Sequence, residues 1–191
     1  MSKARLEAFS DGVIAIIITI MVLELRPPHG VELKDLAPLG PTFLSYVLSF
    51  GLLGTYWANH HHLMHVAKTV SGVALWANMH LLFWLSILPF ATAWIGEEHF
   101  APIPVAVYGA VQLLSAVAYF GLIQALIHAP GQTPDIAIAV GRDVKGKISP
   151  VLYAIATPIA LVLPWVSMAI YGVVLLIWIV PDRRMERVKK A

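Results

Sequence analysis

Long uncharged apolar stretches dominate this sequence and restrict the chain to folds that satisfy their own backbone in lipid. The first lies within residues 5–25, where no charged residue occurs between Gly12 and Leu23. About 20 residues rising roughly 1.5 Å each cross the hydrocarbon core of a bilayer, so residues 6–25 can cross once. Hydrophobic residues make up 59% of the chain and charged residues 13%, with a mean hydropathy of +0.77. These values predict an all-α integral membrane protein with several spans.

Apolar stretches alternate with loops rich in proline, glycine and charge, which predicts six membrane spans. The apolar run from Ile148 to Val180 is too long for one untilted crossing, and Pro164-Trp165 near its middle predicts a hairpin between a fifth and a sixth helix. If this run were one long kinked helix, the chain would have five spans. Pro89 is expected to kink the third span. The spans form one domain over residues 1–191 and are placed at residues 6–25, 41–61, 72–95, 104–128, 148–163 and 166–180.

The basic residues gather on one side of the six-span arrangement, which sets its orientation. That side holds Lys3, Arg5, Lys68, Arg142, Lys145, Lys147 and the basic tail at residues 183–190. The positive-inside rule then places both termini in the cytoplasm. We expect the tail to meet anionic lipid headgroups. A formal net charge of +2 gives no support for nucleic-acid binding, and the lack of cysteine excludes disulfides and thiolate catalysis.

Four residues open the first span in a recognisable pattern, in which Arg5, Phe9, Ser10 and Asp11 read R-x-x-x-F-S-D. This pattern resembles the signature of the transmembrane protein 175 family, whose prokaryotic members are short six-helix potassium channels. The pattern occurs once, as in the single-repeat prokaryotic form. The resemblance therefore implies a homotetrameric potassium channel in the plasma membrane of a prokaryote, with no cofactor beyond the permeant potassium ion. Further similarities to the family lie at Trp57, His60, His61, Trp76, Asn78, Leu81, Leu82, Leu88, Pro89 and Phe90.

One broad stripe of the first span is a candidate lining for an ion pathway. At about 100° per residue, the stripe contains Arg5, Phe9, Ile16, Thr19, Ile20 and Leu23. A single copy of this helix cannot enclose a pore, so several subunits must contribute it around an axis. The resemblance implies a constriction at Ile16, Ile20 and Leu23, in place of a filter of backbone carbonyls. Thr19 is the one side chain of the stripe that could offer hydroxyl oxygens to an ion.

Asp11 lies roughly 140° from Ile16 around the helix and is expected to point into the subunit's own bundle. We expect one polar network there, formed with Trp57, His60, His61, Asn78 and His80. Two roles stay open for Asp11, namely a structural carboxylate that holds the first helix in place or a proton relay. Because histidine titrates near pH 6.5, such a network could make gating sensitive to pH.

The residue pattern bears on metal binding, catalysis and ion transport. His61 and His65 are four residues apart and could share a metal, but no carboxylate lies nearby in sequence, so no metal beyond permeating potassium is predicted. An enzyme is not predicted, because no spacing of nucleophile and base rises above chance. We predict a leak-type potassium channel whose partners are further copies of itself, the lipid bilayer and monovalent cations. The alternative is a proton-coupled secondary transporter that uses Asp11.

Overall fold

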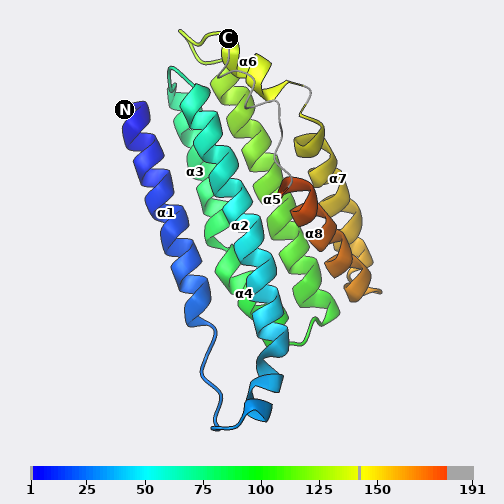
Figure 1. Ribbon diagram of the computed structural model, residues 1–191. Coiled ribbons are helices and arrows are strands. Elements are labelled where there is room, and N and C mark those ends of the chain that lie inside the picture. The colour runs from blue at the N-terminus through cyan, green and yellow to red at the C-terminus, as the bar shows by residue number, and fades with distance from the viewer. Residues whose placement is uncertain (1, 142, 180–191) are drawn as a thin grey trace.

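The computed structural model of the protein describes residues 2–141 and 143–179, apart from the side chains at positions 135 and 139. Arg142 and the basic tail at residues 183–190, with its predicted lipid contacts, lie outside the described residues. Every regular element within the described ranges is a helix, and the long helices run side by side as a bundle (Figure 1). The elements are α1 (Lys3–Leu23), η1 (Leu33–Leu39), α2 (Gly40–Val66), α3 (Gly72–Ser86), α4 (Leu88–Glu97), α5 (Pro102–Ile127), α6 (Asp135–Val140), α7 (Val144–Ile159) and α8 (Pro164–Ile179).

Four helical segments of the described chain are long and apolar enough to cross a membrane. They are α1, the segment Leu33–Val66 formed by η1 and α2, the segment Gly72–Glu97 formed by α3 and α4, and α5. α8 is also apolar but has 16 residues, which at about 1.5 Å per residue reach roughly 24 Å of a hydrocarbon core of about 30 Å. The predicted all-helical membrane architecture is therefore confirmed, with four candidate spans in the part of the chain that the structure describes.

Proline and capping side chains explain where several helices begin and end. Pro41 and Pro102 lie in the first turns of α2 and α5, where a missing N–H leaves no hydrogen bond unmade. Ser71 caps α3 by accepting a hydrogen bond from the backbone N–H of Ala74 at 3.1 Å. Pro89 cannot donate to the preceding turn, and it divides the third apolar stretch into α3 and α4.

α7 and α8 form a helical hairpin. Trp178 Nε1 donates to Ser149 Oγ at 2.9 Å, and Ser167 Oγ donates to a backbone carbonyl of α7 at 2.7 Å, so hydrogen bonds join the two helices at two places. The turn lies at residues 160–163, and Pro164 begins α8 instead of occupying the turn. The reason is that the fixed φ of proline suits the first helical position. These residues do not form the long kinked helix that the sequence left open.

α1 lies at one edge of the bundle, where it packs on α2, α3 and α4 and leaves its other side open (Figure 1). α5, in contrast, packs on α3, α4, α7 and α8. The buried face of α1 consists of Leu6, Ser10, Ile14, Ile17 and Met21. A helix at the edge with one open side is free to contact lipid, solvent or another copy of the chain.

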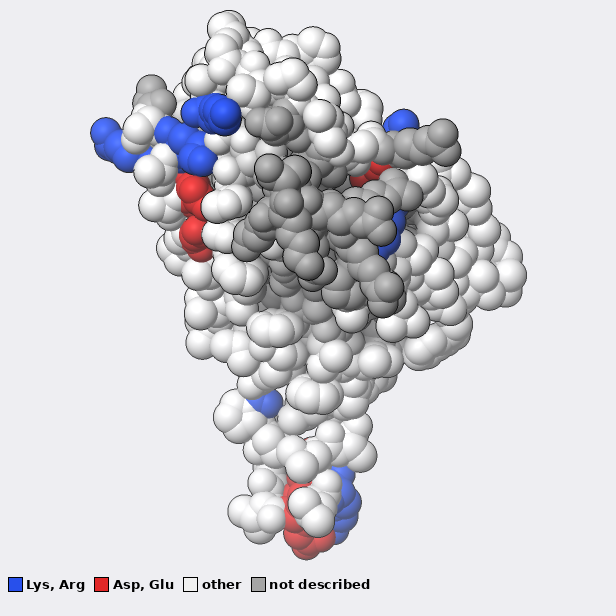
Figure 2. Space-filling model, turned by 45° about the horizontal axis from the view of Figure 1, so that its top comes forward, with Lys and Arg blue, Asp and Glu red and all other residues white. Residues whose placement is uncertain are grey.

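Charged side chains gather at the two ends of the bundle. Figure 2 shows Lys and Arg side chains around the start of α1, and a group of mixed sign at the tip of the loop between α1 and α2. In that loop Lys34 Nζ lies 2.8 Å from Glu32 Oε2. Much of the visible face between these groups is uncharged, as contact with lipid requires.

Candidate functional site

The outer stripe of α1 is exposed in the single subunit. Ile16 is 58% exposed, Ile20 42% and Leu23 74%. Thr19 lies on the same side and is also exposed. Because these positions recur at helical spacing opposite the buried face, they form a continuous apolar strip along the helix. A strip of this kind is suited to face other copies of α1 across an axis.

Thr19 keeps its oxygen available although its proton is used. Thr19 Oγ1 donates to the backbone oxygen of Ile16 at 2.8 Å, within the same helix. A hydroxyl group carries one proton and two acceptor lone pairs, so the lone pairs of Thr19 stay free to accept. An oxygen with free lone pairs is what a monovalent cation needs as a ligand.

A chain of buried polar side chains links α1 to α3 and α2. His60 Nε2 lies 2.8 Å from Asn78 Oδ1, Asn78 Nδ2 donates to Ser10 Oγ at 2.9 Å, and Ser10 Oγ donates to Leu6 O at 2.8 Å. His60, Asn78 and Ser10 are all 0% exposed. Since Asn78 Oδ1 can only accept, His60 carries its proton on Nε2, and its Nδ1 has no hydrogen-bond partner within the described residues. A polar group buried in an apolar bundle lowers stability unless it is hydrogen-bonded. The chain therefore fixes the position of α1 against α3.

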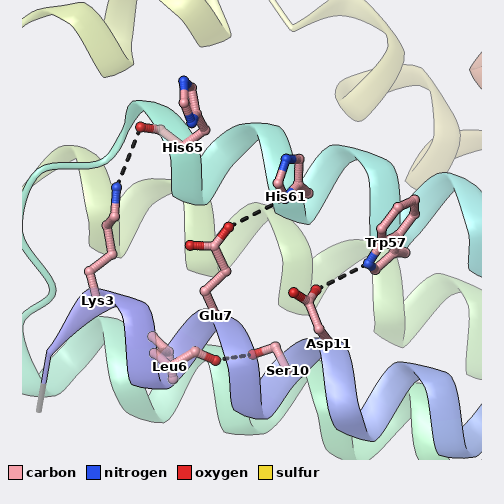
Figure 3. A network of polar contacts seen from close by, with 8 residues as sticks. All are labelled: Lys3, Leu6, Glu7, Ser10, Asp11, Trp57, His61 and His65. Atoms are coloured by element: carbon pink, nitrogen blue, oxygen red, sulfur yellow. Dashed lines mark hydrogen bonds and ion pairs between the residues drawn. The ribbon is translucent and has the colours of Figure 1, made fainter.

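Asp11 contacts α2 at a place separate from the buried chain. Trp57 Nε1 donates to Asp11 Oδ1 at 3.1 Å (Figure 3). Trp57 is 46% exposed and Asp11 is half-buried, so this contact lies at the border of the bundle and not inside it. A hydrogen bond to a carboxylate is stronger than one between neutral groups, which makes this contact an anchor for α1 on α2.

Two further contacts join α1 to α2 nearer the start of α1. His61 Nδ1 lies 3.3 Å from Glu7 Oε1, and Lys3 Nζ donates to His65 O at 3.5 Å (Figure 3). α1 and α2 run in opposite directions, so residues four apart on one helix meet residues four apart on the other in reverse order. Lys3 and Glu7 were not predicted as residues of the site. The available signal was the regular spacing of four residues from Lys3 to Glu7 and from Glu7 to Asp11.

Three of the predicted residues lie apart from these contacts. His80 is exposed, and its Nε2 accepts a hydrogen bond from Trp84 Nε1 at 2.8 Å, one turn along α3. Arg5 and Phe9 are exposed on the outer side of α1, and within the described residues no ion pair joins Arg5 to a carboxylate. The residues expected in one network therefore form two separate groups. One is the buried chain of His60, Asn78 and Ser10, and the other is the set of partly exposed contacts between α1 and α2. The physical reason is that Ser10 and Asp11 differ by about 100° around α1 and face different helices.

The histidines of α2 contact one another but do not gather around a common point with carboxylates. The rings of His61 and His65 are stacked with their centroids 6.5 Å apart. Among the residues that the structure describes, no group of three or more His, Cys, Asp or Glu side chains could hold a metal ion. These rings therefore take part in stacking along α2 and, through His61, in the contact with Glu7 of α1.

A groove of about 760 Å³ flanks α1 along the half of the helix that leads to Leu23. Ile16 and Ile20 line one wall, and Phe90 and Trp94 of α4 line the other. The groove leaves Ile16 and Ile20 open on this flank, although Ile14, Ile17 and Met21 of the same half are buried.

Comparisons with known proteins place these features in one family. The sequence profile of the family described as endosomal/lysosomal potassium channel TMEM175 matches residues 5–89, which include the R-x-x-x-F-S-D pattern, His60 and Asn78. The chain is 48% identical over 187 residues to a potassium channel of Chryseobacterium sp., with 98% of this chain and 97% of that protein covered. It is 30% identical over 184 residues to a potassium channel of Chamaesiphon minutus, with 87% and 88% covered.

A solved structure shows the same arrangement of helices. The crystal structure of a lysosomal potassium-selective channel TMEM175 homolog from Chamaesiphon minutus superposes with a TM-score of 0.75 at 27% identity. The match covers 92% of this chain and 95% of that one. The similarity therefore extends through α5 and the α7–α8 hairpin, beyond the residues that the family profile matches.

Proposed function

This chain belongs to the TMEM175 family of potassium channels, and we propose that it conducts potassium along a pathway lined by the outer stripe of α1. The family is one of channels and not of enzymes. The observation that carries the proposal is the exposure of Ile16, Thr19 and Leu23 in the single subunit, on a side of α1 that no other described helix covers. Large aliphatic side chains left open on an edge helix need a partner, and further copies of α1 provide one.

The membrane topology that we propose has six spans with both termini in the cytoplasm. Besides the four candidate spans, the α7–α8 hairpin supplies two short crossings, since its turn at residues 160–163 carries no charge. Support for the orientation comes from the basic side chains near the start of α1 and in the α6–α7 region, which the positive-inside rule assigns to the cytoplasm. A bacterial relative of nearly the same length supports a location in the plasma membrane of a prokaryote.

We propose that four subunits surround the pathway. One α1 helix cannot enclose a pore, and identical subunits commonly assemble with closed symmetry around an axis. The exposed flank of each α1 would then contact its neighbours, while the Ser10 and Asp11 contacts hold each helix to its own bundle. The pathway is lined by rings of Ile16, Ile20 and Leu23, with Thr19 between the first and the last ring.

Selectivity in this proposal arises from removal of water. Rings of isoleucine and leucine offer no ligand, so an ion that passes a narrow ring must lose part of its hydration shell. Potassium sheds water more cheaply than sodium, which favours potassium without a cage of backbone carbonyls. The Thr19 oxygens partly replace the lost water. Glu24, at the end of α1, raises the local concentration of cations. We therefore expect a leak-type current with modest selectivity.

A proton-coupled transporter that uses Asp11 is not favoured. The relatives are potassium channels by name, and Asp11 accepts a hydrogen bond from Trp57, which suits a structural carboxylate. A transporter would give saturating flux that depends on a proton gradient.

The test is planar-bilayer recording from the purified protein with potassium opposed to sodium. We expect unitary currents whose reversal potential favours potassium. Ile16→Asn and Leu23→Ala should alter conductance or selectivity, because they change the rings. Val22→Asn is the matched control, since Val22 is an exposed aliphatic residue of α1 that lies off the stripe. Unchanged currents from both ring variants would place the pathway elsewhere.

A further inference from the structure

A second buried polar chain crosses the bundle beside the outer half of α1. Thr92 Oγ1 lies 2.7 Å from Ser49 Oγ, Ser49 Oγ lies 3.1 Å from the Tyr108 hydroxyl, and Gln112 Nε2 donates to that hydroxyl at 3.1 Å. Thr92 is 4% exposed and the other three residues are 0% exposed. They belong to α4, α2 and α5, so the chain joins three helices that surround α1 or support its neighbours.

Which hydroxyl donates to which in this chain follows from the Leu88 carbonyl at its end, because a carbonyl oxygen cannot donate. Thr92 Oγ1 lies 2.7 Å from the carbonyl oxygen of Leu88, which only accepts. With the Thr92 proton on that carbonyl, Ser49 donates to Thr92 and Tyr108 donates to Ser49. The Gln112 amide completes the chain by donating to Tyr108. Each hydroxyl then donates once and accepts once, an arrangement in which successive hydrogen bonds strengthen one another.

The chain ends against the buried face of α1. Thr92 Oγ1 lies 3.9 Å from Met21 Sδ, and Met21 is 1% exposed. Ile20 precedes Met21 and Leu23 follows it by two positions, and both of these side chains point to the exposed side of the helix. Because a helix moves as a unit, the position of Met21 sets the positions of Ile20 and Leu23.

α1 is held unequally along its length. Its first half contacts α2 and α3 through the side chains of Glu7, Ser10 and Asp11. Beyond Asp11, α1 is held by the packing of its buried residues Ile14, Ile17 and Met21. Met21 Sδ packs 3.9 Å from Thr92 Oγ1, whose proton lies on the Leu88 carbonyl. The groove of about 760 Å³ flanks the same half. The placement of the outer half of α1 therefore depends on packing and not on hydrogen bonds.

We propose that Thr92 is a positioning residue for the ion pathway. The chain from Gln112 to Thr92 fixes the surface on which Met21 packs, and it thereby sets the width of the rings at Ile20 and Leu23. This inference rests on the proposed function, in which those side chains line the pathway. Apolar residues of similar shape would fill the same space, so the contribution of the chain is a defined position for α1 more than added stability.

The test compares Thr92→Val with Thr92→Ser in the assembled protein, in planar bilayers with potassium opposed to sodium. Valine keeps the shape and removes the oxygen, whereas serine keeps the hydroxyl. Ser115→Ala is the matched control, because Ser115 is 1% exposed and bonds to Val111 O of its own helix at 2.8 Å. We expect Thr92→Val to change the potassium-to-sodium permeability ratio by about threefold or more, the scale of one hydrogen bond. Thr92→Ser and Ser115→Ala should keep the wild-type ratio.

Met21→Ala provides a second, independent variant, because it removes the side chain that packs on Thr92. It should change the permeability ratio as Thr92→Val does, and it decides the question alone if Thr92→Val does not assemble. Wild-type ratios in these variants, together with altered currents in Ile16→Asn, overturn this inference and leave the proposed pathway in place. Unaltered currents in both Ile16→Asn and Leu23→Ala would instead overturn the proposed pathway itself.

Discussion

The buried chain from His60 through Asn78 to Ser10 makes a quantitative prediction for Asn78→Leu. Leucine has the same branched shape as asparagine but cannot make hydrogen bonds. The substitution removes the bonds to His60 and from Asn78 to Ser10, at 2.8 and 2.9 Å. It also leaves the His60 Nε2 proton without an acceptor, in a ring whose Nδ1 already lacks a donor among the described residues. Ser10 is less affected, because it still donates to Leu6 O.

The cost of this substitution can be estimated from its parts. Two hydrogen bonds at about 1 kcal/mol each, plus about 1–3 kcal/mol for the unpaired proton of His60, give roughly 3–5 kcal/mol. Hydrogen bonds measured inside membrane proteins average about 0.6 kcal/mol, which sets a lower bound of roughly 2 kcal/mol for the whole change. We therefore expect Asn78→Leu to lower the free energy of unfolding by about 2–5 kcal/mol.

Unfolding in mixed detergent and SDS micelles measures this free energy. Asn59→Leu is the matched control, because Asn59 Nδ2 donates to Thr55 O of its own helix at 2.6 Å and makes no bond to α1. It should cost less than about 1 kcal/mol. Adding His60→Phe to Asn78→Leu should cost less than His60→Phe costs alone, since the partner is already lost. Equal losses from Asn78→Leu and Asn59→Leu, with additive double substitution, would refute the role assigned to the chain.

Three further substitutions test other contacts. Trp57→Phe keeps the ring but removes the N–H that donates to Asp11, so we expect less assembled oligomer in size-exclusion chromatography; a normal yield would count against this anchor. Gln132→Ala removes two hydrogen bonds to the backbone of the α2–α3 loop, at Lys68 and Thr69, and one to Leu126 O of α5, so the melting temperature should fall by several degrees, about 2–4 °C per kcal/mol. Gly96→Ala places a methyl carbon 2.7 Å from a Cα atom of α2, so α2 and α4 must separate and the melting temperature should fall. Gly121→Ala, with no atom within 4 Å of the new carbon, should not lower it, and equal effects of the two alanines would contradict the packing argument.

The all-helical membrane class could be predicted from hydropathy because lipid leaves few ways to satisfy a backbone. The ends of helices were harder to predict. α7 begins at Val144, four residues before the apolar run at Ile148, because Lys145 and Lys147 interrupt the apolar pattern without interrupting the helix. Long basic side chains tolerate this position, since their apolar stems pack while the charges reach water. Hydropathy reports where lipid begins, whereas helical hydrogen bonds continue past that point.

The direction of a side chain around one helix could be predicted, but its partner on another helix could not. The 100° rule places Asp11 away from the exposed stripe, and the structure places its carboxylate on Trp57 of α2. The pairing of Glu7 with His61 depends on the register of two antiparallel helices, which no local pattern encodes. Thr92 gave even less signal, because an isolated threonine in an apolar segment is compatible with any surroundings.

In the proposed pathway, selectivity depends on how α1 is placed and not on a rigid loop. A filter of backbone carbonyls carries its geometry in the loop itself, whereas a ring of aliphatic side chains has only the geometry that the packing of its helices provides. Each copy of α1 contributes one side chain to a ring. A small shift of the helix therefore occurs once in every subunit, and the shifts add up in the width of the ring. The inner face of α1, with Ser10 at one end and Met21 at the other, should therefore control selectivity as strongly as the outer face that meets the ion. Substitutions that alter inner contacts without altering any lining residue separate this account from one in which the lining alone decides.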